Sequence, residues 1–389
     1  MSADCVGPFD SPEVNFSPYR TVASAIVAVW RDFVEIEFGS ARAAQASMAA
    51  LVVAVSVGVA CAMHLQEVWW AAISGFISSQ ATRPASVKKA LLRVTGTMAG
   101  AALCLALVGW LAYDMFACVL ALFVISSIGI LGVNVSPHGY AWLFFSVTFS
   151  LVLLMSLVDP LNAFSFAINR TIEVVIGATV AIAIAFAMAP EESVVENPAP
   201  RGWTDLFDAQ WPVVLHALRG GIAVAMTPII WSYFYLPGVS ATATTMTSVL
   251  AVPVLSDNPM DSNRKMVEKA MHRLLGCLVG GVAGLMLLAV PLTQLLPWLT
   301  AVAAGTWSFA YLQGSTRGIG YIGTQAAVVF IITLVQGDGP PTSIMPGINR
   351  FAGIAIGMMT LFIICILLQP KSDTQPPAAA NTRTRARRL

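Results

Sequence analysis

Two ionisable residues lie one helical turn apart at the beginning of a long apolar segment, and their side chains are well suited to chemistry. Arg170 and Glu173 open an apolar run that ends at Pro190. A guanidinium binds carboxylates and other oxyanions, and a carboxyl group inside a membrane span is a candidate proton carrier. A structural role is the alternative, in which Arg170 forms an ion pair with Glu173 or anchors the segment at the membrane surface.

The segment around Arg170 occurs a second time. Ile348-Asn349-Arg350 repeats Ile168-Asn169-Arg170 in the second half of the chain, although Gly353 stands in place of Glu173. The same step along the chain relates six further residues to their counterparts, namely Lys89, Arg93, Gly96, Gly100, Gly177 and Pro190 to Lys269, Arg273, Gly276, Gly280, Gly357 and Pro370. The step spans almost half of the chain, and so long a period predicts a duplicated membrane module rather than an array of short repeats.

Composition indicates which elements must position these residues. The chain is 57% hydrophobic and only 11% charged, whereas soluble domains carry about a quarter charged residues. Because a bilayer cannot hydrogen-bond a bare backbone, and the apolar runs reach about 20 residues, we predict an all-α membrane protein in a lipid bilayer. The net charge of +1 suggests no nucleic-acid partner, and the scattered cysteines and histidines predict no metal site or cofactor.

We expect about twelve transmembrane helices, arranged as two parallel six-helix repeats, each preceded by an amphipathic interfacial helix. The expected parts are a disordered N-terminus (1–20), a first membrane module (21–189), a cytoplasmic linker (190–201), a second membrane module (202–369) and a disordered basic tail (370–389). The spans are expected near 44–63, 67–83, 91–112, 115–134, 139–157 and 168–189, then 214–233, 236–255, 271–290, 295–313, 319–336 and 349–368.

The distribution of basic residues predicts the orientation. Of the 21 lysines and arginines, only Arg170 and Arg350 fall on the face opposite the N-terminus. Basic residues concentrate on the cytoplasmic side of membrane proteins, so both termini are expected in the cytoplasm. Arg170 and Arg350 are then expected on the outer side, at helix N-termini, where the helix dipole disfavours a cation.

Small and polar residues inside the spans have two interpretations. The second and eighth expected spans are rich in serine and threonine, whose side chains either stabilise contacts between helices or line a polar path. Gly96 and Gly100, and again Gly276 and Gly280, have the spacing of closely packed helices. Arg93 and Arg273, which open these glycine-containing spans, are expected to anchor them at the inner face.

Several stretches of the first half resemble the fusaric-acid-resistance and aromatic-acid-exporter family. These are Trp69-Trp70-Ala71, Lys89-Ala90-Leu91-Leu92-Arg93-Val94-Thr95-Gly96-Thr97, Tyr140-Ala141-Trp142 and Arg170-Thr171-Ile172-Glu173-Val174-Val175-Ile176-Gly177. The second half follows through the repeat and Asp257-Asn258-Pro259. The resemblance implies a bacterial inner-membrane exporter of aromatic carboxylic acids or related weak acids, energised by the proton gradient. It also implies a periplasmic adaptor protein as a partner, and it leaves a homo-oligomer open.

A mechanism follows from this resemblance and from the residue types. Arg170 and Arg350 are expected to bind the substrate carboxylate, Tyr140, Trp142 and Trp307 to stack on its ring, and Glu173 to couple transport to protons. No catalytic residue is expected. One alternative is a passive organic-anion channel. Another is an intramembrane transferase, for which Asp257 and Asp261 form a candidate metal pair.

Overall fold

The computed structural model describes residues 18–192, 211–234, 259–290, 292–337, 339–340 and 343–367, and throughout these residues the regular structure is helical. The prediction of an all-α protein is therefore confirmed. The helices of the first half are α1 (Pro18–Val34), α2 (Ala41–Ala62), α3 (Trp69–Ser78), α4 (Arg83–Leu111), α5 (Met115–Val135), α6 (Gly139–Val158), η1 (Pro160–Asn162) and α7 (Ala163–Met188). Those of the second half are α8 (Trp211–Phe234), α10 (Pro259–Leu288), α11 (Leu295–Gln313), α12 (Gly320–Leu334) and α13 (Met345–Leu367).

Eight helices in the described part of the chain are long and apolar enough to cross a membrane. They confirm a multi-pass membrane protein, and α12 and the apolar part of α13 are shorter apolar helices. The eighth expected span, 236–255, lies outside the described residues, as do most of the expected linker and both terminal segments.

The second expected span is wrong, because α3 has only 10 residues, or about 15 Å at the rise of an α-helix, which is half the hydrocarbon thickness. Ser79 turns to an extended conformation, and Pro84 in the first turn of α4 starts a new helix. The Gln80 side-chain amide donates to the carbonyls of Ile77 and Ser79, at 2.9 and 2.8 Å. Polar side chains thus satisfy backbone groups that the broken helix leaves open.

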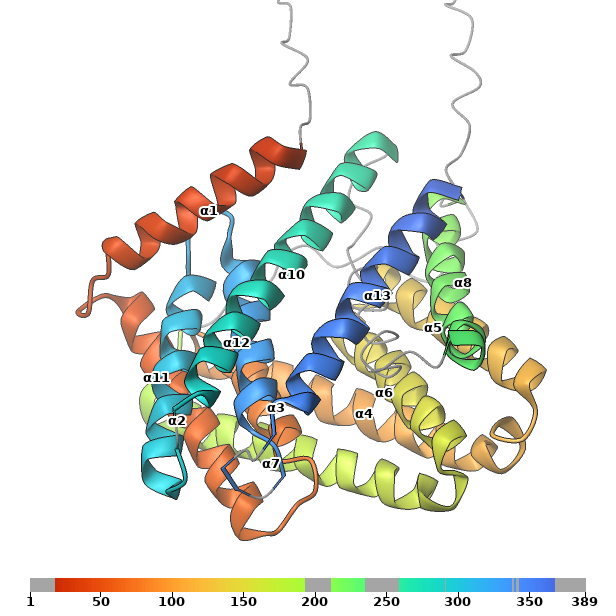
Figure 1. The fold of residues 1–389 in the computed structure, drawn as a ribbon, viewed down its shortest axis with the longest axis horizontal. Helices are drawn as coiled ribbons and strands as arrows, with labels where there is room; N and C mark the ends of the chain where they lie inside the picture. The colour runs from red at the N-terminus through yellow and green to blue at the C-terminus, as the bar shows by residue number, and fades with distance from the viewer. Residues whose placement is uncertain are drawn as a thin grey trace, which may run out of the picture.

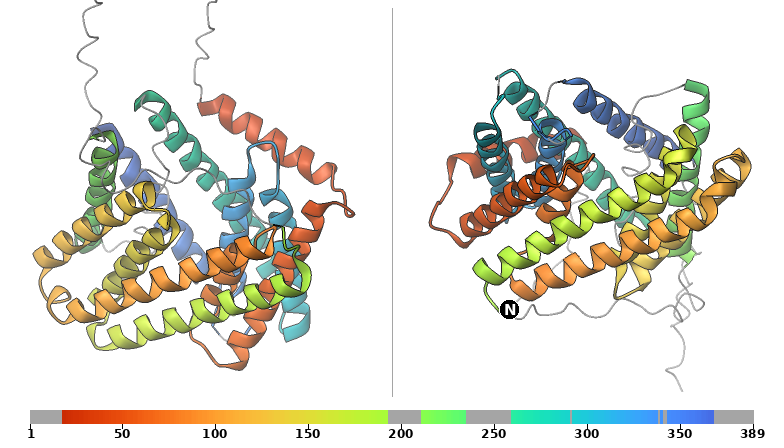
Figure 2. Two further views of the ribbon diagram at one scale, coloured as in Figure 1. Left: turned by 180° about the vertical axis from the view of Figure 1, so that it is seen from behind. Right: turned by 90° about the horizontal axis from the view of Figure 1, so that it is seen from below.

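The helices of the two halves interleave. α2 packs along α11, and α5 packs along α8. Within the halves, α4 packs against α6 and α7, and α10 packs against α12. Figure 2 shows α4 and α7 side by side in its right-hand view. The main apolar cores accordingly combine residues of both halves, one around α2, α3, α11 and α12 and the other around α4 to α6 and α8.

Glycines permit the closest helix contacts, as their spacing predicted. A Cβ atom on Gly100 would lie 2.3 Å from the carbonyl oxygen of Phe145, and one on Gly280 would lie 2.1 Å from that of Ala326. Both distances are far below van der Waals contact, so only glycine fits at these two crossings of α4 with α6 and of α10 with α12. The prediction of close packing at these glycines is confirmed.

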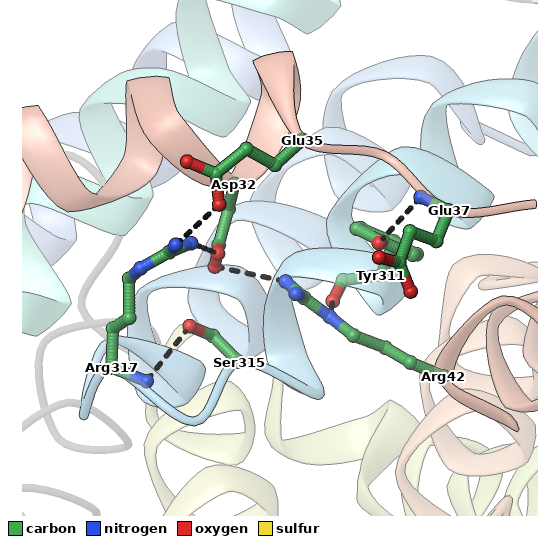
Figure 3. Close-up of polar contacts among 7 residues, drawn as sticks. All are labelled: Asp32, Glu35, Glu37, Arg42, Tyr311, Ser315 and Arg317. Carbon is green, nitrogen blue, oxygen red and sulfur yellow. Dashed lines mark hydrogen bonds and ion pairs between the residues drawn. The ribbon is translucent and has the colours of Figure 1, made fainter. Parts of the chain in front are cut away.

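Helix α1 packs on the second half and is fixed there by a polar cluster (Figure 3). Asp32, only 2% exposed, accepts hydrogen bonds from Arg42 at 2.9 Å and from Arg317, while Arg317 also pairs with Glu35. Arg42 donates to the Tyr311 carbonyl as well. Burial alone would raise the pKa of Asp32, but hydrogen bonds from Arg42, Ser315 and Arg317 outweigh burial and lower the pKa below its ordinary value.

The opposite side of α1 is apolar and exposed. Ile26, Trp30 and Val34 are 51%, 70% and 66% exposed. The amphipathic helix expected before the first repeat is present as α1 and ends at Val34. In Figure 1 the first turn of α1 and the last turn of α13 lie at the same side of the molecule, and the left view of Figure 2 agrees.

Candidate functional site

A cavity of about 140 Å³ lies between α3, α6, α7 and the loop that joins α2 to α3. Arg170 and Glu173 both line this cavity. Its walls are formed by Gln66, Glu67, Trp69, Trp70, Leu151, Met155, Phe166, Asn169, Arg170 and Glu173. The loop residues Gln66 and Glu67 are exposed and form the rim, whereas Arg170 and Glu173 are only 2% and 1% exposed.

The position of Arg170 on its helix differs from the expectation. The sequence predicts Arg170 at a helix N-terminus, but α7 begins at Ala163, so Arg170 lies two turns inside the helix. The short helix η1 and the apolar residues from Ala163 onward extend α7 beyond the expected start. α13 likewise begins at Met345, more than one turn before Arg350. The penalty of a cation at a helix N-terminus therefore does not apply to either residue.

Close packing of α7 on α3 brings an aromatic ring to Arg170. A Cβ atom on Gly177 would lie 2.1 Å from the carbonyl oxygen of Ala71, so the two backbones touch at this point. At the residue before Ala71, Trp70 places its ring 3.2 Å from the guanidinium carbon of Arg170. Such a contact between a cation and an aromatic face is favourable and strengthens away from water.

Hydrogen bonds fix the acidic part of the cavity. An oxygen of the Glu173 carboxylate accepts from the backbone N–H of Glu67 at 3.0 Å. The Glu67 side chain accepts from the indole N–H of Trp69, and Asn169 donates to Gln66 at 3.2 Å. The loop before α3 is thereby tied to α7, and the charged groups are held in one arrangement.

The size and lining of the cavity limit what it can hold. An apolar cavity of about 150 Å³ accepts benzene, whereas pockets for drug-sized ligands measure about 300–1,000 Å³. A cavity of about 140 Å³ therefore suits a single small ring. Arg170 supplies a cation for a carboxylate, and Leu151, Met155 and Phe166 supply apolar contacts.

The three aromatic residues proposed from the sequence lie elsewhere. Tyr140 is near the start of α6 and accepts a hydrogen bond from Arg93 at 3.3 Å. Trp142 packs edge-on against Phe145, and the indole of Trp307 on α11 donates to Ser47 at 3.0 Å. None of them lines the cavity of Arg170. Arg350 belongs to α13, but its side chain is outside what the structure describes.

Trp70 lines the cavity beside Arg170, but the sequence did not predict it as a binding residue. Trp69-Trp70 carries only the family resemblance. The proximity of Trp70 to Arg170 depends on the crossing of α3 with α7, which residue spacing along one helix does not reveal.

The described residues give the transferase alternative no support. Among them, no three or more histidine, cysteine, aspartate or glutamate side chains lie close enough together to hold a metal ion. Asp257 lies outside the described part of the chain, and so does the side chain of Asp261. Cys61, Cys104, Cys118 and Cys277 are buried on four different helices.

Comparisons with known proteins agree with the resemblance seen in the sequence. A family model described as fusaric acid resistance protein-like matches residues 49–184, which run from α2 to α7 and contain the whole lining of the cavity. No curated protein and no solved structure matches the chain. Over residues 49–184 the chain is therefore similar to the fusaric-acid-resistance family, a family of membrane transporters.

Proposed function

We propose that this protein is an efflux transporter that exports aromatic carboxylic acids or related weak organic acids across a bacterial inner membrane, driven by the proton gradient. The family match over residues 49–184 implies membrane transport. The observation that carries the narrower proposal is the cavity in which Arg170, Trp70 and Glu173 meet, because it offers a cation, an aromatic face and a carboxylate within a space suited to one ring.

The steps follow from these three side chains. Arg170 binds the substrate carboxylate, and Trp70 with Phe166 contacts the ring. When the anion leaves, the ionised carboxylate of Glu173 takes the guanidinium as its partner. A proton from outside then neutralises Glu173, is carried inward and is released to the cytoplasm, so that one proton enters for each anion that is exported. An inside-negative potential assists export by about 2.3 kcal/mol per 100 mV for each negative charge that moves outward.

The membrane arrangement is part of the same proposal. Both termini are cytoplasmic, and the two halves are parallel six-helix repeats. The first turn of α1 and the last turn of α13 lie at the same side, which is compatible with an even number of spans. The reciprocal packing of α2 with α11 and of α5 with α8 supports a repeat. By the repeat step α8 corresponds to α2 and α11 corresponds to α5, so the two pairs are copies of one helix contact. A periplasmic adaptor protein and self-association remain proposed partners.

Efflux measurements test the function. Cells that express the protein are loaded with labelled benzoate and related aromatic acids, and export is followed with and without an uncoupler. The expected result is uncoupler-sensitive export that falls at least about tenfold in Arg170→Gln, because the substrate anion loses its buried partner. Glu191→Gln, at an exposed residue beyond α7, is the matched control and leaves export unchanged.

The competing channel function predicts a different outcome. A passive channel gives steady conductance in a planar bilayer without a pH gradient, and its flux survives the uncoupler. Steady conductance without a pH gradient, flux that survives the uncoupler, or unchanged export in Arg170→Gln would each exclude the proton-driven mechanism proposed for this cavity.

A further inference from the structure

A second group of cationic and aromatic side chains lies at the start of α4, away from the cavity. Lys89 and Arg93 are one helical turn apart on α4, and both face Tyr140 at the start of α6. The Lys89 ammonium is 5.5 Å from the centre of the Tyr140 ring, and Arg93 donates to the Tyr140 hydroxyl at 3.3 Å. On its other side the guanidinium of Arg93 covers the ring of Phe144 at 4.0 Å.

These two cations are not neutralised within the described part of the chain. The ion pairs found there involve Arg42, Arg83 and Arg317, and none involves Lys89 or Arg93. Arg93 is only 1% exposed, and its Nε–H is buried without an acceptor. Like charges one turn apart repel each other, and a buried charge without a counterion is costly. An arginine has five N–H donors, of which Tyr140 takes one.

The second half contains the same group. Lys269 is 5.3 Å from the centre of the Tyr321 ring, against 5.5 Å for Lys89 and Tyr140. Arg273 donates to the Tyr321 hydroxyl at 3.3 Å, the same distance as from Arg93 to the Tyr140 hydroxyl. An interfacial anchor needs only a flexible side chain that reaches the headgroups, whereas this geometry is fixed by contacts between helices and occurs twice.

The group at α4 is separate from the Arg170 cavity. Leu151 is the first α6 residue of the cavity, and Tyr140 lies about three turns before it, or about 16 Å along the helix. The start of α4 touches the other end of α7, where the Arg83 N–H donates to the Pro190 carbonyl at 2.9 Å. Arg170 lies in the first half of α7, several turns before the helix ends at Met188. The cation group at α4 therefore lies at a different depth along the helices from the cavity.

We propose that Lys89, Arg93 and Tyr140 form an oxyanion-binding site, and that Lys269, Arg273 and Tyr321 form its twin. The ligand is a carboxylate or phosphate group, because a guanidinium, an ammonium and a phenol hydroxyl together offer several donors and two positive charges. Two sources supply such a group at this level, namely a soluble organic anion and the headgroup of an anionic lipid. The site goes beyond the proposed transport function, because its occupancy is measurable without transport.

Binding to the purified full-length protein tests this site. The protein is reconstituted in nanodiscs of phosphatidylcholine only, and binding of benzoate and inorganic phosphate is titrated by calorimetry. A parallel sample contains phosphatidylglycerol, and native mass spectrometry counts the anionic lipids that stay bound. We compare Lys89→Gln, Lys269→Gln and the double variant with Lys88→Gln, a control at the exposed neighbouring residue that removes the same charge.

A soluble ligand is expected to bind two equivalents outside the cavity, and each single variant weakens one of them by about tenfold or more. If a lipid headgroup is the ligand, the variants instead lose retained phosphatidylglycerol while soluble anions bind neither site. Both results support an oxyanion site and distinguish its source. Equal binding in wild type and in the double variant, or equal losses in Lys88→Gln, overturns the proposal.

Two further variants separate binding from folding and from transport. Tyr140→Phe removes only the hydroxyl that accepts from Arg93, and a loss of anion binding at an unchanged melting temperature identifies a direct contact. Arg170→Gln removes anion binding in the cavity and leaves the two sites at α4 and α10 intact. Failure of the cavity proposal and failure of this proposal therefore give different results.

Discussion

The cation groups at the starts of α4 and α10 occur twice, whereas the carboxylate of the cavity occurs once. The lysine-to-ring distances are 5.5 and 5.3 Å in the two groups, and both arginines donate to their tyrosine hydroxyls at 3.3 Å. Glu173, by contrast, corresponds to Gly353. The proposed oxyanion sites thus occur in both halves, while the buried carboxylate proposed to exchange a proton, Glu173, occurs in the first half. The comparison teaches that any proton coupling through Glu173 is limited to one site per chain.

The most damaging change is expected at this single carboxylate. Glu173→Gln keeps the shape of the side chain but cannot ionise, so Arg170 loses the group with which the substrate anion alternates. Proton-driven export should fall by at least about a hundredfold, a loss that corresponds to about 3 kcal/mol, while passive exchange of anion for anion continues. Export at imposed pH gradients in proteoliposomes measures the first, and counterflow of labelled benzoate measures the second. Gradient-driven export at the wild-type rate would exclude Glu173 from coupling.

The sequence predicted this pair of residues better than it predicted their surroundings. Arg170 and Glu173 are one turn apart, and helical periodicity alone brings them to the same face. Trp70 is brought to them by the contact of Gly177 with Ala71, which joins two helices far apart in the chain. Spacing along a helix carries no information on such a crossing, so the sequence predicted Tyr140, Trp142 and Trp307 as the aromatic contacts and not Trp70.

Helix boundaries show the same limit. The apolar run through residues 67–83 predicted a full span, yet serine, glutamine and proline side chains end α3 after 10 residues. Hydropathy averages over such a segment and does not register that the side chains of Gln80 and Ser86 hydrogen-bond the backbone where the helix breaks. The glycine contacts were predicted correctly, since a small residue every four positions has few other uses in an apolar helix.

Repeated packing can be tested at the glycines of both halves. Gly100→Val and Gly280→Val each force a side chain into a carbonyl group of the neighbouring helix. Each is expected to cost about 1–3 kcal/mol of stability, or more if the helices cannot separate. Thermal unfolding in detergent compares them with Gly109→Val on α4, where a Cβ atom would meet nothing within 4 Å. A large loss in one half only would show that the two helix pairs are not packed alike.

The polar cluster at α1 joins the two halves and is not repeated in the sequence, since Pro212 and Ile222 stand at the positions of the second half that correspond to Asp32 and Arg42. Asp32→Asn should destabilise the protein by about 2 kcal/mol at neutral pH, because hydrogen bonds to an ionised group are lost. The lowered pKa of Asp32 fixes the sign of the pH dependence. Its contribution is complete above the ordinary value of 3.8 and disappears as pH falls through the lowered pKa of the folded state.

Melting temperatures of wild type and Asp32→Asn measured from pH 7 downward check this expectation, and the difference between them should shrink only below about pH 4. Asp114→Asn is a comparison variant. Asp114 is exposed and caps α5, and none of the four ion pairs in the described part of the chain joins it to an arginine. A constant difference between wild type and Asp32→Asn across this range would mean that Asp32 is not held ionised by its arginines.

The smallest expected effect concerns a difference between the twin cation groups in what lies against the guanidinium. Phe144 lies under the guanidinium of Arg93, whereas Gln325 occupies the corresponding place and accepts from Arg273 at 2.8 Å. An aromatic face leaves the N–H donors of Arg93 available, while the amide oxygen occupies one donor of Arg273. The first site should therefore bind an oxyanion a few-fold more tightly than the second. Phe144→Gln and Gln325→Phe should together invert the order of the two affinities in the calorimetric titration. If the site with Lys89 still binds more tightly than the site with Lys269 after this exchange, the difference in affinity comes from other surrounding charges and not from these two contacts.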